Sequence, residues 1–251
     1  MTPEQYRFYQ GDYAVQLVLG YMRRAVQQYD MIQDGDKIAV GVSGGKDSVM
    51  LLAGLAALRR FIGIQYDLVC ITIDPGFNEQ VADYTAIREL CEKLEVPFVQ
   101  KNTNIGQVVF DIRKEKNPCS LCAKMRRGSL DDAAKELGCN KLALGHHRED
   151  AIETFMMNLI IQGRVGCYAP VTYLHRKDIT VIRPLCLAHE KDIIGAVRRQ
   201  GLPVVKSRCP ADNAGTARED MKNFLKRLEK EYPDVNKRLF GAMQRGHIDG
   251  W

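Results

Sequence analysis

The stretch KIAVGVSGGKDSVMLLAGLAAL, from Lys37 to Leu58, decides the fold. Its first residues predict a buried strand, its glycines predict a tight turn, and its apolar remainder predicts a helix. Glycine lets a backbone approach an anion closely, and a helix that follows offers free N–H groups and the positive end of its dipole. The stretch therefore predicts a loop that holds phosphate.

Two common phosphate loops do not fit this turn. In a Walker A loop, four residues separate the glycines, but only three separate Gly41 from Gly45. Asp47 also stands where a Ser or Thr would bind magnesium. A dinucleotide fingerprint fails as well, because Ser43 occupies its second glycine position.

The turn does match SGGKDS at residues 43–48, which resembles the PP-loop of ATP pyrophosphatases. That resemblance implies that the loop holds the β and γ phosphates of ATP, which leave as pyrophosphate while a substrate oxygen is adenylated. The candidate nucleotide-binding residues are Ser43, Gly44, Gly45, Lys46, Asp47 and Ser48. Lys46 can offset phosphate charge, whereas a capping, orienting or catalytic role for Asp47 stays open.

The rest of the chain alternates strand-like and helical segments. The predicted strands are 37–42, 67–73, 97–101, 141–145 and 179–183, and the predicted helices are 12–29, 47–61, 79–94, 120–137, 148–162 and 189–200. Short Val, Ile and Leu runs separated by helices predict an α/β fold with a doubly wound, mostly parallel sheet. We expect a helical N-terminal extension at 1–33, a nucleotide-binding domain at 34–210 and basic helices at 211–251.

Two further segments support nucleotide binding. DLVCITIDPGF ends the second predicted strand at Asp74, and ligands of open parallel sheets bind at that strand edge. LALGHHREDAIET runs from the fourth predicted strand through Gly145 and His146 into a helix with Asp150. It is similar to a GHxxDD element of PP-loop enzymes, so we expect these three residues beside the nucleotide. Without that similarity, His146 could equally be a capping or surface histidine.

Three of the eight cysteines need a separate explanation. Cys119 and Cys122 form a CxxC pair in NPCSLCAKMRRGSL, and Cys209 follows in VVKSRCPADN. The pair alone could be a redox motif, and a structural zinc site would need a fourth ligand that no nearby CxxC or CxxH supplies. Three thiolates with an open position suit a [4Fe–4S] cluster. The other five cysteines are predicted to be small buried residues.

Taken together, SGGKDS, DPGF, CSLCAKMRRG, LALGHHREDAIET, IRPL, EKDI and Cys209 resemble the TtcA family from about Asp34 onward. The resemblance implies ATP-dependent synthesis of 2-thiocytidine at position 32 of tRNA, with ATP, Mg²⁺ and a [4Fe–4S] cluster as cofactors. It implies that Cys119, Cys122 and Cys209 hold the cluster and, with Lys46 and Asp47, form the catalytic set. Sulfide held on the free iron would replace the adenylated oxygen. A cysteine desulfurase or another donor would supply the sulfur.

The charge pattern bears on the partner. A net charge of +5 permits a nucleic-acid partner without requiring one. The candidate tRNA phosphate contacts are Lys124, Arg126, Arg127 and Arg164. A second basic group could extend that surface or form a solvated helix face, and it comprises Lys222, Lys226, Arg227 and Lys230.

No apolar run approaches the ~20 residues of a membrane span, and the N-terminal segment does not resemble a signal peptide. We therefore expect a cytoplasmic protein with no membrane partner; a homodimer is compatible with the sequence, which does not fix the oligomeric state.

Two other functions stay open: a PP-loop enzyme acting on another RNA base or a small molecule, and a non-enzymatic iron–sulfur or zinc regulatory protein.

Overall fold

A six-stranded sheet of order β3-β2-β1-β4-β6-β5 forms the centre of the protein. The computed structural model describes residues 12–77, 82–114, 118–206, 208–211 and 216–251. The strands are β1 Asp36–Gly41, β2 Tyr66–Asp74, β3 Phe98–Asn102, β4 Lys141–Ala143, β5 Val171–Leu174 and β6 Ile179–Ile182. All pairings are parallel except that of β5 with β6, which confirms the predicted mostly parallel sheet.

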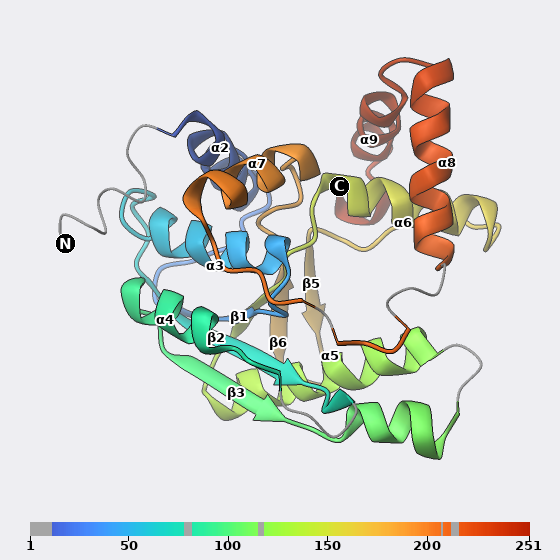
Figure 1. Ribbon diagram of the computed structural model, residues 1–251. Helices are drawn as coiled ribbons and strands as arrows, with labels where there is room; N and C mark the ends of the chain where they lie inside the picture. The colour runs from blue at the N-terminus through green and yellow to red at the C-terminus, as the bar shows by residue number, and fades with distance from the viewer. Residues whose placement is uncertain (1–11, 78–81, 115–117, 207, 212–215) are drawn as a thin grey trace.

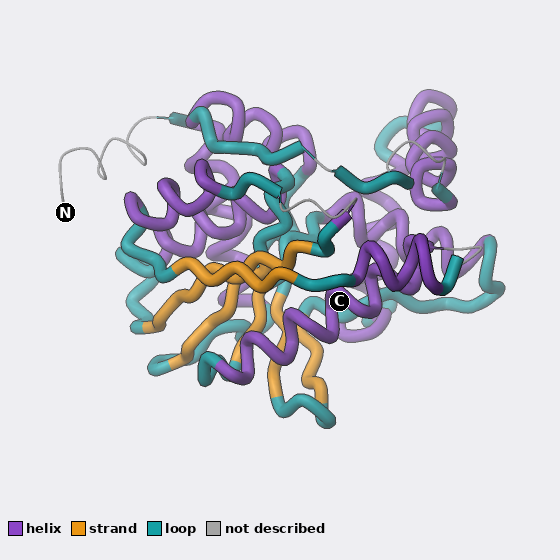
Figure 2. Tube along the Cα trace, turned by 60° about the horizontal axis from the view of Figure 1, so that its bottom comes forward, coloured by secondary structure: helices purple, strands orange, loops and turns teal. Residues whose placement is uncertain are grey.

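Helices cover both faces of this sheet (Figures 1 and 2). The helices are α2 Tyr13–Gln28, α3 Lys46–Leu58, α4 Thr85–Lys93, α5 Pro118–Glu136, α6 Arg148–Ile160, α7 Glu190–Gln200, α8 Ala217–Glu231 and α9 Val235–Arg245. On one face α2, α3 and α7 pack against one another, and α5 covers the other face. The C-terminal helices α8 and α9 pack on α6 and on each other. None of the helices within the described residues has the length and apolar character needed to cross a membrane.

Alternating side chains divide the interior into two cores. Ile38 and Val40 of β1 belong to the core under α3, whereas Ala39 belongs to the core under α5. In β2, Cys70 faces the first core and Ile71 the second. This period of two is what a strand buried on both faces requires, and it fixes the register of the central strands. Parallel pairing then brings the carboxyl ends of β1, β2 and β4 to one edge of the sheet.

The structure differs from the predicted elements in four places. The sequence did not reveal β5, because its hairpin turns at Asp178, whose φ of 48° replaces the glycine that would mark such a turn. A π-helix at Gln107–Ile112 was also not predicted. The helix predicted at 79–94 begins at Thr85, with 79–81 outside the described residues. The strand predicted at 141–145 ends at Ala143.

Candidate active site

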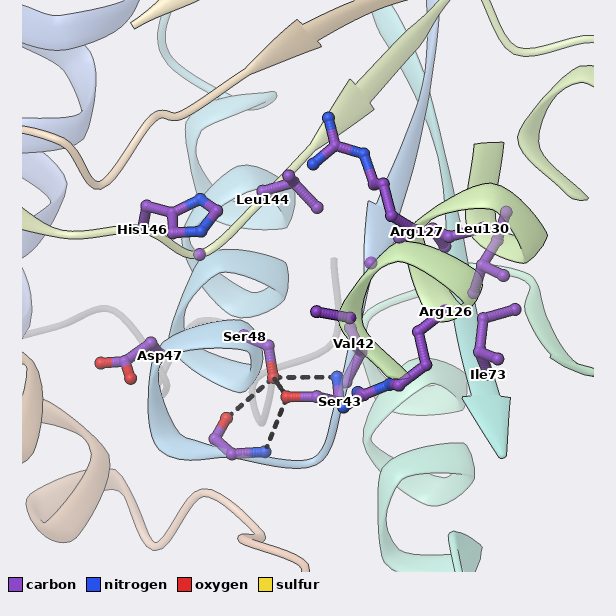
Figure 3. A pocket seen from close by; sticks show the side chains of 15 residues that line it. Val42, Ser43, Asp47, Ser48, Ile73, Arg126, Arg127, Leu130, Leu144 and His146 are labelled. Atoms are coloured by element: carbon purple, nitrogen blue, oxygen red, sulfur yellow. Dashed lines mark hydrogen bonds between the residues drawn. The ribbon is translucent and has the colours of Figure 1, made fainter. Parts of the chain in front are cut away.

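The segment Ser43–Ser48 joins β1 to α3 and closes on itself through its serines (Figure 3). The Ser43 N–H donates to Ser48 Oγ at 3.2 Å, and Ser48 Oγ donates to the Gly45 carbonyl at 2.9 Å. The two hydroxyl oxygens lie 3.2 Å apart. Gly45 caps α3 without a side-chain hydrogen bond, so the first N–H groups of the helix are available to an anion.

A distant segment lies directly over this loop. The Val205 N–H donates to the Gly44 carbonyl at 3.0 Å. Gly44 has a φ of 87°, and a Cβ at this position would come within 2.8 Å of the Val205 Cβ. Gly44 is therefore needed both for its backbone conformation and for the close passage of the segment that leads to Cys209.

The β4–α6 connection packs against the other side of the loop. A Cβ on Gly145 would lie 3.1 Å from the Asp47 carbonyl carbon and 3.1 Å from the Ser48 nitrogen. Only glycine permits this approach without displacing the start of α3. The contact explains why Gly145 stands beside the nucleotide loop, as expected from the sequence.

The two adjacent histidines have separate roles. His147 is the N-cap of α6: its N–H donates to Asp150 Oδ2 at 3.0 Å, and the Asp150 N–H donates to His147 Nδ1 at 3.4 Å. Burial disfavours the imidazolium, but Glu149, Asp150 and Asp47 outweigh it and raise the pKa of His147. The capping role that the sequence left open as an alternative for His146 thus belongs to His147.

His146 faces the cavity instead. Its ring centroid lies 5.0 Å from that of Tyr168, and its buried Nδ1 has no partner among the described residues. Burial, followed by the positive charge of Arg183, lowers the pKa of His146 to about 4. The imidazole is therefore neutral near pH 7, and its Nδ1 can hydrogen-bond to a ligand.

Carboxylates surround the loop lysine. Lys46 Nζ lies 2.9 Å from Asp47 Oδ2 and 3.2 Å from Glu190 Oε1. Burial favours the neutral amine, but these two carboxylates outweigh it and raise the pKa of Lys46. Asp47 Oδ1 is buried and has no hydrogen-bond partner within the described part of the chain. Glu190 begins α7, and only the EKDI motif of the sequence indicated it.

The C-terminal helix α8 reaches the same network. Lys222 Nζ lies 2.7 Å from Glu190 Oε2, and Arg218 Nη1 lies 2.9 Å from Asp150 Oδ1. Lys222 is thus engaged with a carboxylate of the site rather than presented to solvent with Lys226, Arg227 and Lys230. Sequence reasoning did not identify Arg218.

A cavity of about 390 Å³ opens between the PP-loop and α5 (Figure 3). Its apolar wall is formed by Ile71, Ile73, Leu130 and Leu144. Its polar groups come from Ser43, Asp47, Ser48, Arg126, Arg127 and His146. Size and lining both suit a nucleotide, since apolar walls accept a base and the helix N-terminus accepts phosphate.

A second cavity of about 240 Å³ shares Ser43, Gly45 and Arg126 with the first, and Asp74 lines it. Asp74 lies at the strand edge, as predicted. Its two carboxylate oxygens accept the N–H groups of Gly76 at 2.9 Å and Ala82 at 2.7 Å. Asp74 thus holds the connection after β2 in place.

The three candidate cluster cysteines come together beside these cavities. Cys119 and Cys122 lie near the start of α5, where Cys122 directly precedes Ala123 of the cavity wall, and Cys209 packs against the core that contains Cys122. Burial raises the pKa of Cys122, Arg126 opposes this effect, and the nearby Cys209 and Cys119 add to it. Cys119 is exposed and Cys209 half-buried.

The predicted RNA contacts divide into two groups. Arg126 lines both cavities, and Arg127 lines the first while its Nε lies 3.1 Å from Asp131 Oδ1. Lys124 is exposed on the same helix. Arg164 follows the far end of α6, about 20 Å of helix from His147, so the structure does not bring it to the PP-loop.

The sheet, the loop and the cavity define a PP-loop nucleotide-binding protein. A family model described as PP-loop domain matches residues 20–227. The chain is 42% identical over 226 residues to the tRNA-cytidine(32) 2-sulfurtransferase of Geobacter metallireducens, covering 88% of this chain and 86% of that one. It is 39% identical over 226 residues to the enzyme of the same name from Pelobacter propionicus, covering 89% and 83%. The chain belongs to the PP-loop domain family and, within it, to the family of tRNA-cytidine(32) 2-sulfurtransferases, which confirms the resemblance.

A solved structure has the same fold. It is the U34-tRNA thiolase NcsA from Methanococcus maripaludis with its [4Fe-4S] cluster, with a TM-score of 0.74 and 24% identity over 97% of this chain and 84% of that one. At this identity the likeness confirms the fold class.

Proposed function

We propose that this protein converts cytidine 32 of tRNA into 2-thiocytidine at the expense of ATP. The observation that carries this proposal is that a phosphate-binding loop and the helix with two candidate cluster cysteines border the same cavity. The PP-loop forms one wall of the cavity, and α5, which carries Cys119 and Cys122 near its start, forms the other. The names of the relatives at about 40% identity support the same reaction.

The PP-loop residues would bind ATP. The N–H groups at the start of α3 and the hydroxyls of Ser43 and Ser48 would hold phosphate oxygens, and Lys46 would offset their charge. Asp47 Oδ1, which accepts no hydrogen bond within the described residues and lies 3.9 Å from His147 Nε2, would bind a magnesium ion together with phosphate oxygens, because Mg²⁺ prefers such oxygen ligands. His146 would contact the bound ligand through its free Nδ1.

Cys119, Cys122 and Cys209 would hold a [4Fe–4S] cluster. Their mutual proximity suits this group, and the charge of the neighbouring Arg126 opposes the burial that raises the pKa of Cys122. Among the described residues, no group of three His, Cys, Asp or Glu side chains is placed to hold a single metal ion. Each thiolate of a cluster binds a different iron atom, so the sulfurs need not converge on one point. When bound, the cluster would supply an iron without a protein ligand, at which sulfide can be held.

The proposed chemistry has two steps. The cytidine O2 attacks the α phosphorus of ATP, and the bond to the pyrophosphate group breaks. Sulfide, supplied by a cysteine desulfurase or another donor, then adds to C2, and AMP leaves with the former O2. Lys46 and the α3 N-terminus would stabilise the pyrophosphate, and Arg126, which lines both cavities, would hold phosphate of the nucleotide or the RNA.

The test is a reaction with anaerobically reconstituted protein, unmodified tRNA, ATP, Mg²⁺ and sulfide. We expect 2-thiocytidine in the digested tRNA and one AMP for each thiolated base. A product thiolated on uridine would assign a different base, and ADP in place of AMP would contradict the role of the PP-loop. Loss of the iron without loss of thiolation would contradict the assignment of the cysteines.

A further inference from the structure

A third cavity, larger than the two described above, lies outside the candidate active site. It has a volume of about 1020 Å³ and opens between α2, the start of α6 and α9. Its charged lining consists of Arg24, Arg148, Lys237, Arg238 and Arg245, with Asp234 as the only carboxylate among the described lining residues. A concentration of cations of this kind focuses a positive potential that attracts a polyanion.

These cations form no ion pairs within the described part of the chain, although the charges of Glu149 and Glu229 act on Arg148 at longer range. Of the five, none has a carboxylate within ion-pair distance there. Four of them lie on α2 and α9, neither of which contains an acidic residue, whereas Arg148 lies on α6 beside Glu149 and Asp150. By contrast, α8 carries Glu219, Asp220, Glu229 and Glu231 among its basic residues. Charge segregation therefore distinguishes α9, rather than α8, as the basic C-terminal surface.

Side-chain contacts hold the cation on the floor of the cavity, whereas the cations at its rim are exposed. Arg148 lies over the Phe240 ring at 4.9 Å, and its Nη1 lies 2.7 Å from His189 Nε2. Arg24, Lys237 and Arg245 are exposed around it. This arrangement combines one fixed cation with several that can follow an irregular backbone, as phosphate contacts to RNA do.

The cavity also lies close to the candidate active site. His146 lines the nucleotide cavity and Arg148 lines the basic cavity, and two residues span about 7 Å at most. The two cavities are thus separated by the segment around His147.

We propose that this basic cavity binds the sugar–phosphate backbone of the substrate RNA, near the base that reacts. The inference rests on the proposed tRNA substrate and adds a second contact region to the one predicted on α5. Its volume exceeds what a single nucleotide fills, and its cations come from three separate helices. Both features favour an extended polyanion over a small phosphate compound.

The experiment compares two charge-matched triple variants of the full chain. The cavity variant is Arg24→Glu with Lys237→Glu and Arg245→Glu. The control variant is Arg23→Glu with Arg176→Glu and Lys191→Glu, three exposed cations that do not line the cavity. Arg23 and Arg24 are adjacent on α2, and each variant replaces three cations by glutamate. Comparing the two variants therefore tests the position of the replaced cations while the change in net charge stays the same. Equal melting temperatures and equal ATP affinity would show that both variants fold and keep the nucleotide site.

We expect the cavity variant to lose at least about tenfold in tRNA affinity near physiological salt, and the slope of log K against log salt to become shallower by about 2 to 3. The control variant should change both quantities much less. Equal losses in the two variants would overturn the proposal. So would unchanged tRNA binding combined with lost binding of tripolyphosphate or of phosphatidylglycerol vesicles, which would assign another anion.

The outcomes also separate this inference from the proposed function. If the wild-type protein binds tRNA through the cavity but forms no 2-thiocytidine, the reaction is wrong and the RNA site stands. If thiolation occurs and the two variants behave alike, the reaction stands and the RNA site is wrong. If the wild-type protein binds no tRNA, both fail.

Discussion

The helices α3 and α5 begin on opposite walls of one cavity but are built differently. Every residue of α3 from Ser48 to Leu58 is buried, because the helix lies between the sheet and the layer of α2 and α7. Of the 19 residues of α5, only Cys122, Leu130, Asp131, Ala133 and Ala134 are buried. A helix that is apolar on all sides is held by packing, whereas a helix with one buried face can present side chains to a ligand.

This difference separates two tasks. The α3 wall offers mainly backbone N–H groups and short hydroxyls, whose positions the surrounding contacts fix. The α5 wall offers arginine side chains at partly exposed positions, where a large substrate can reach them, and the turn before this wall carries the exposed Cys119 and the buried Cys122. Phosphate binding benefits from a preorganised backbone, and binding of a macromolecule benefits from accessible charge.

The largest effect is expected on the α5 wall. Cys122→Ser should abolish thiolation and lower the iron content of anaerobically reconstituted protein, while ATP binding is retained, because the PP-loop lies on the other wall. Iron analysis, the absorption spectrum and nucleoside mass spectrometry measure this. Cys70→Ala, at a cysteine buried in the α3-side core, is the control and should keep its iron. A Cys122 variant with full iron content would show that this wall does not hold a cluster.

The reverse pattern is expected on the α3 wall. Lys46→Ala should lower the rate of thiolation by about 10²–10³-fold, because it removes one preorganised charge from the phosphate site. Iron content should stay at the wild-type level. Lys191→Ala, an exposed lysine on α7, serves as the control for loss of a positive charge. Loss of iron in the Lys46 variant would mean that the two walls are not independent.

A pH-dependent effect is expected at Glu153, which is only 4% exposed on α6. Burial, followed by the charge of Asp150, raises the pKa of Glu153 from 4.5 to about 7. The folded state then binds more protons than the unfolded state in this interval, so the carboxyl costs stability as the pH rises from 4.5 to 7. Relative to wild type, Glu153→Gln should gain up to about 3 kcal/mol of unfolding free energy on going from about pH 4.5 to about pH 8. Urea unfolding at both pH values measures it, and a pH-independent difference would contradict the raised pKa.

The smallest effects compare one glycine from each side of the cavity. Gly145→Ala should cost about 1–3 kcal/mol and weaken ATP binding, because its Cβ would press on the backbone of Asp47 and Ser48 at 3.1–3.2 Å. Gly128→Ala in α5, where a Cβ would meet nothing within 4 Å, should stabilise by about 0.5–1 kcal/mol. Thermal unfolding with and without ATP separates the two. Similar changes in both would show that the α3 wall is no tighter than the α5 wall.

The strand–loop–helix unit at Lys37–Leu58 and the class of protein follow from the sequence alone. The reason is local: short apolar runs, glycines and a helix in register leave little conformational freedom, and SGGKDS excludes the other phosphate loops. The CxxC pair, the third cysteine and the basic run after Cys122 were equally visible, because they depend on residue type and spacing. The sequence also predicted five of the six strands, and missed β5 because Asp178 adopts a conformation that glycine usually marks.

The surroundings of the loop, by contrast, depend on how distant segments pack together. Val205 lies over Gly44, and Glu190 forms an ion pair with Lys46. In each pair the two residues are about 140 positions or more apart in the chain, so no local sequence pattern encodes the contact. Packing against Tyr168 turned His146 toward the cavity, whereas its neighbour His147 became the cap of α6. The folding of α9 beside α6 gathered Lys237, Arg245 and the distant Arg24 around one basic cavity. Periodicity along the chain specifies which faces are apolar, but the meeting of charges from separate helices depends on how those faces pack.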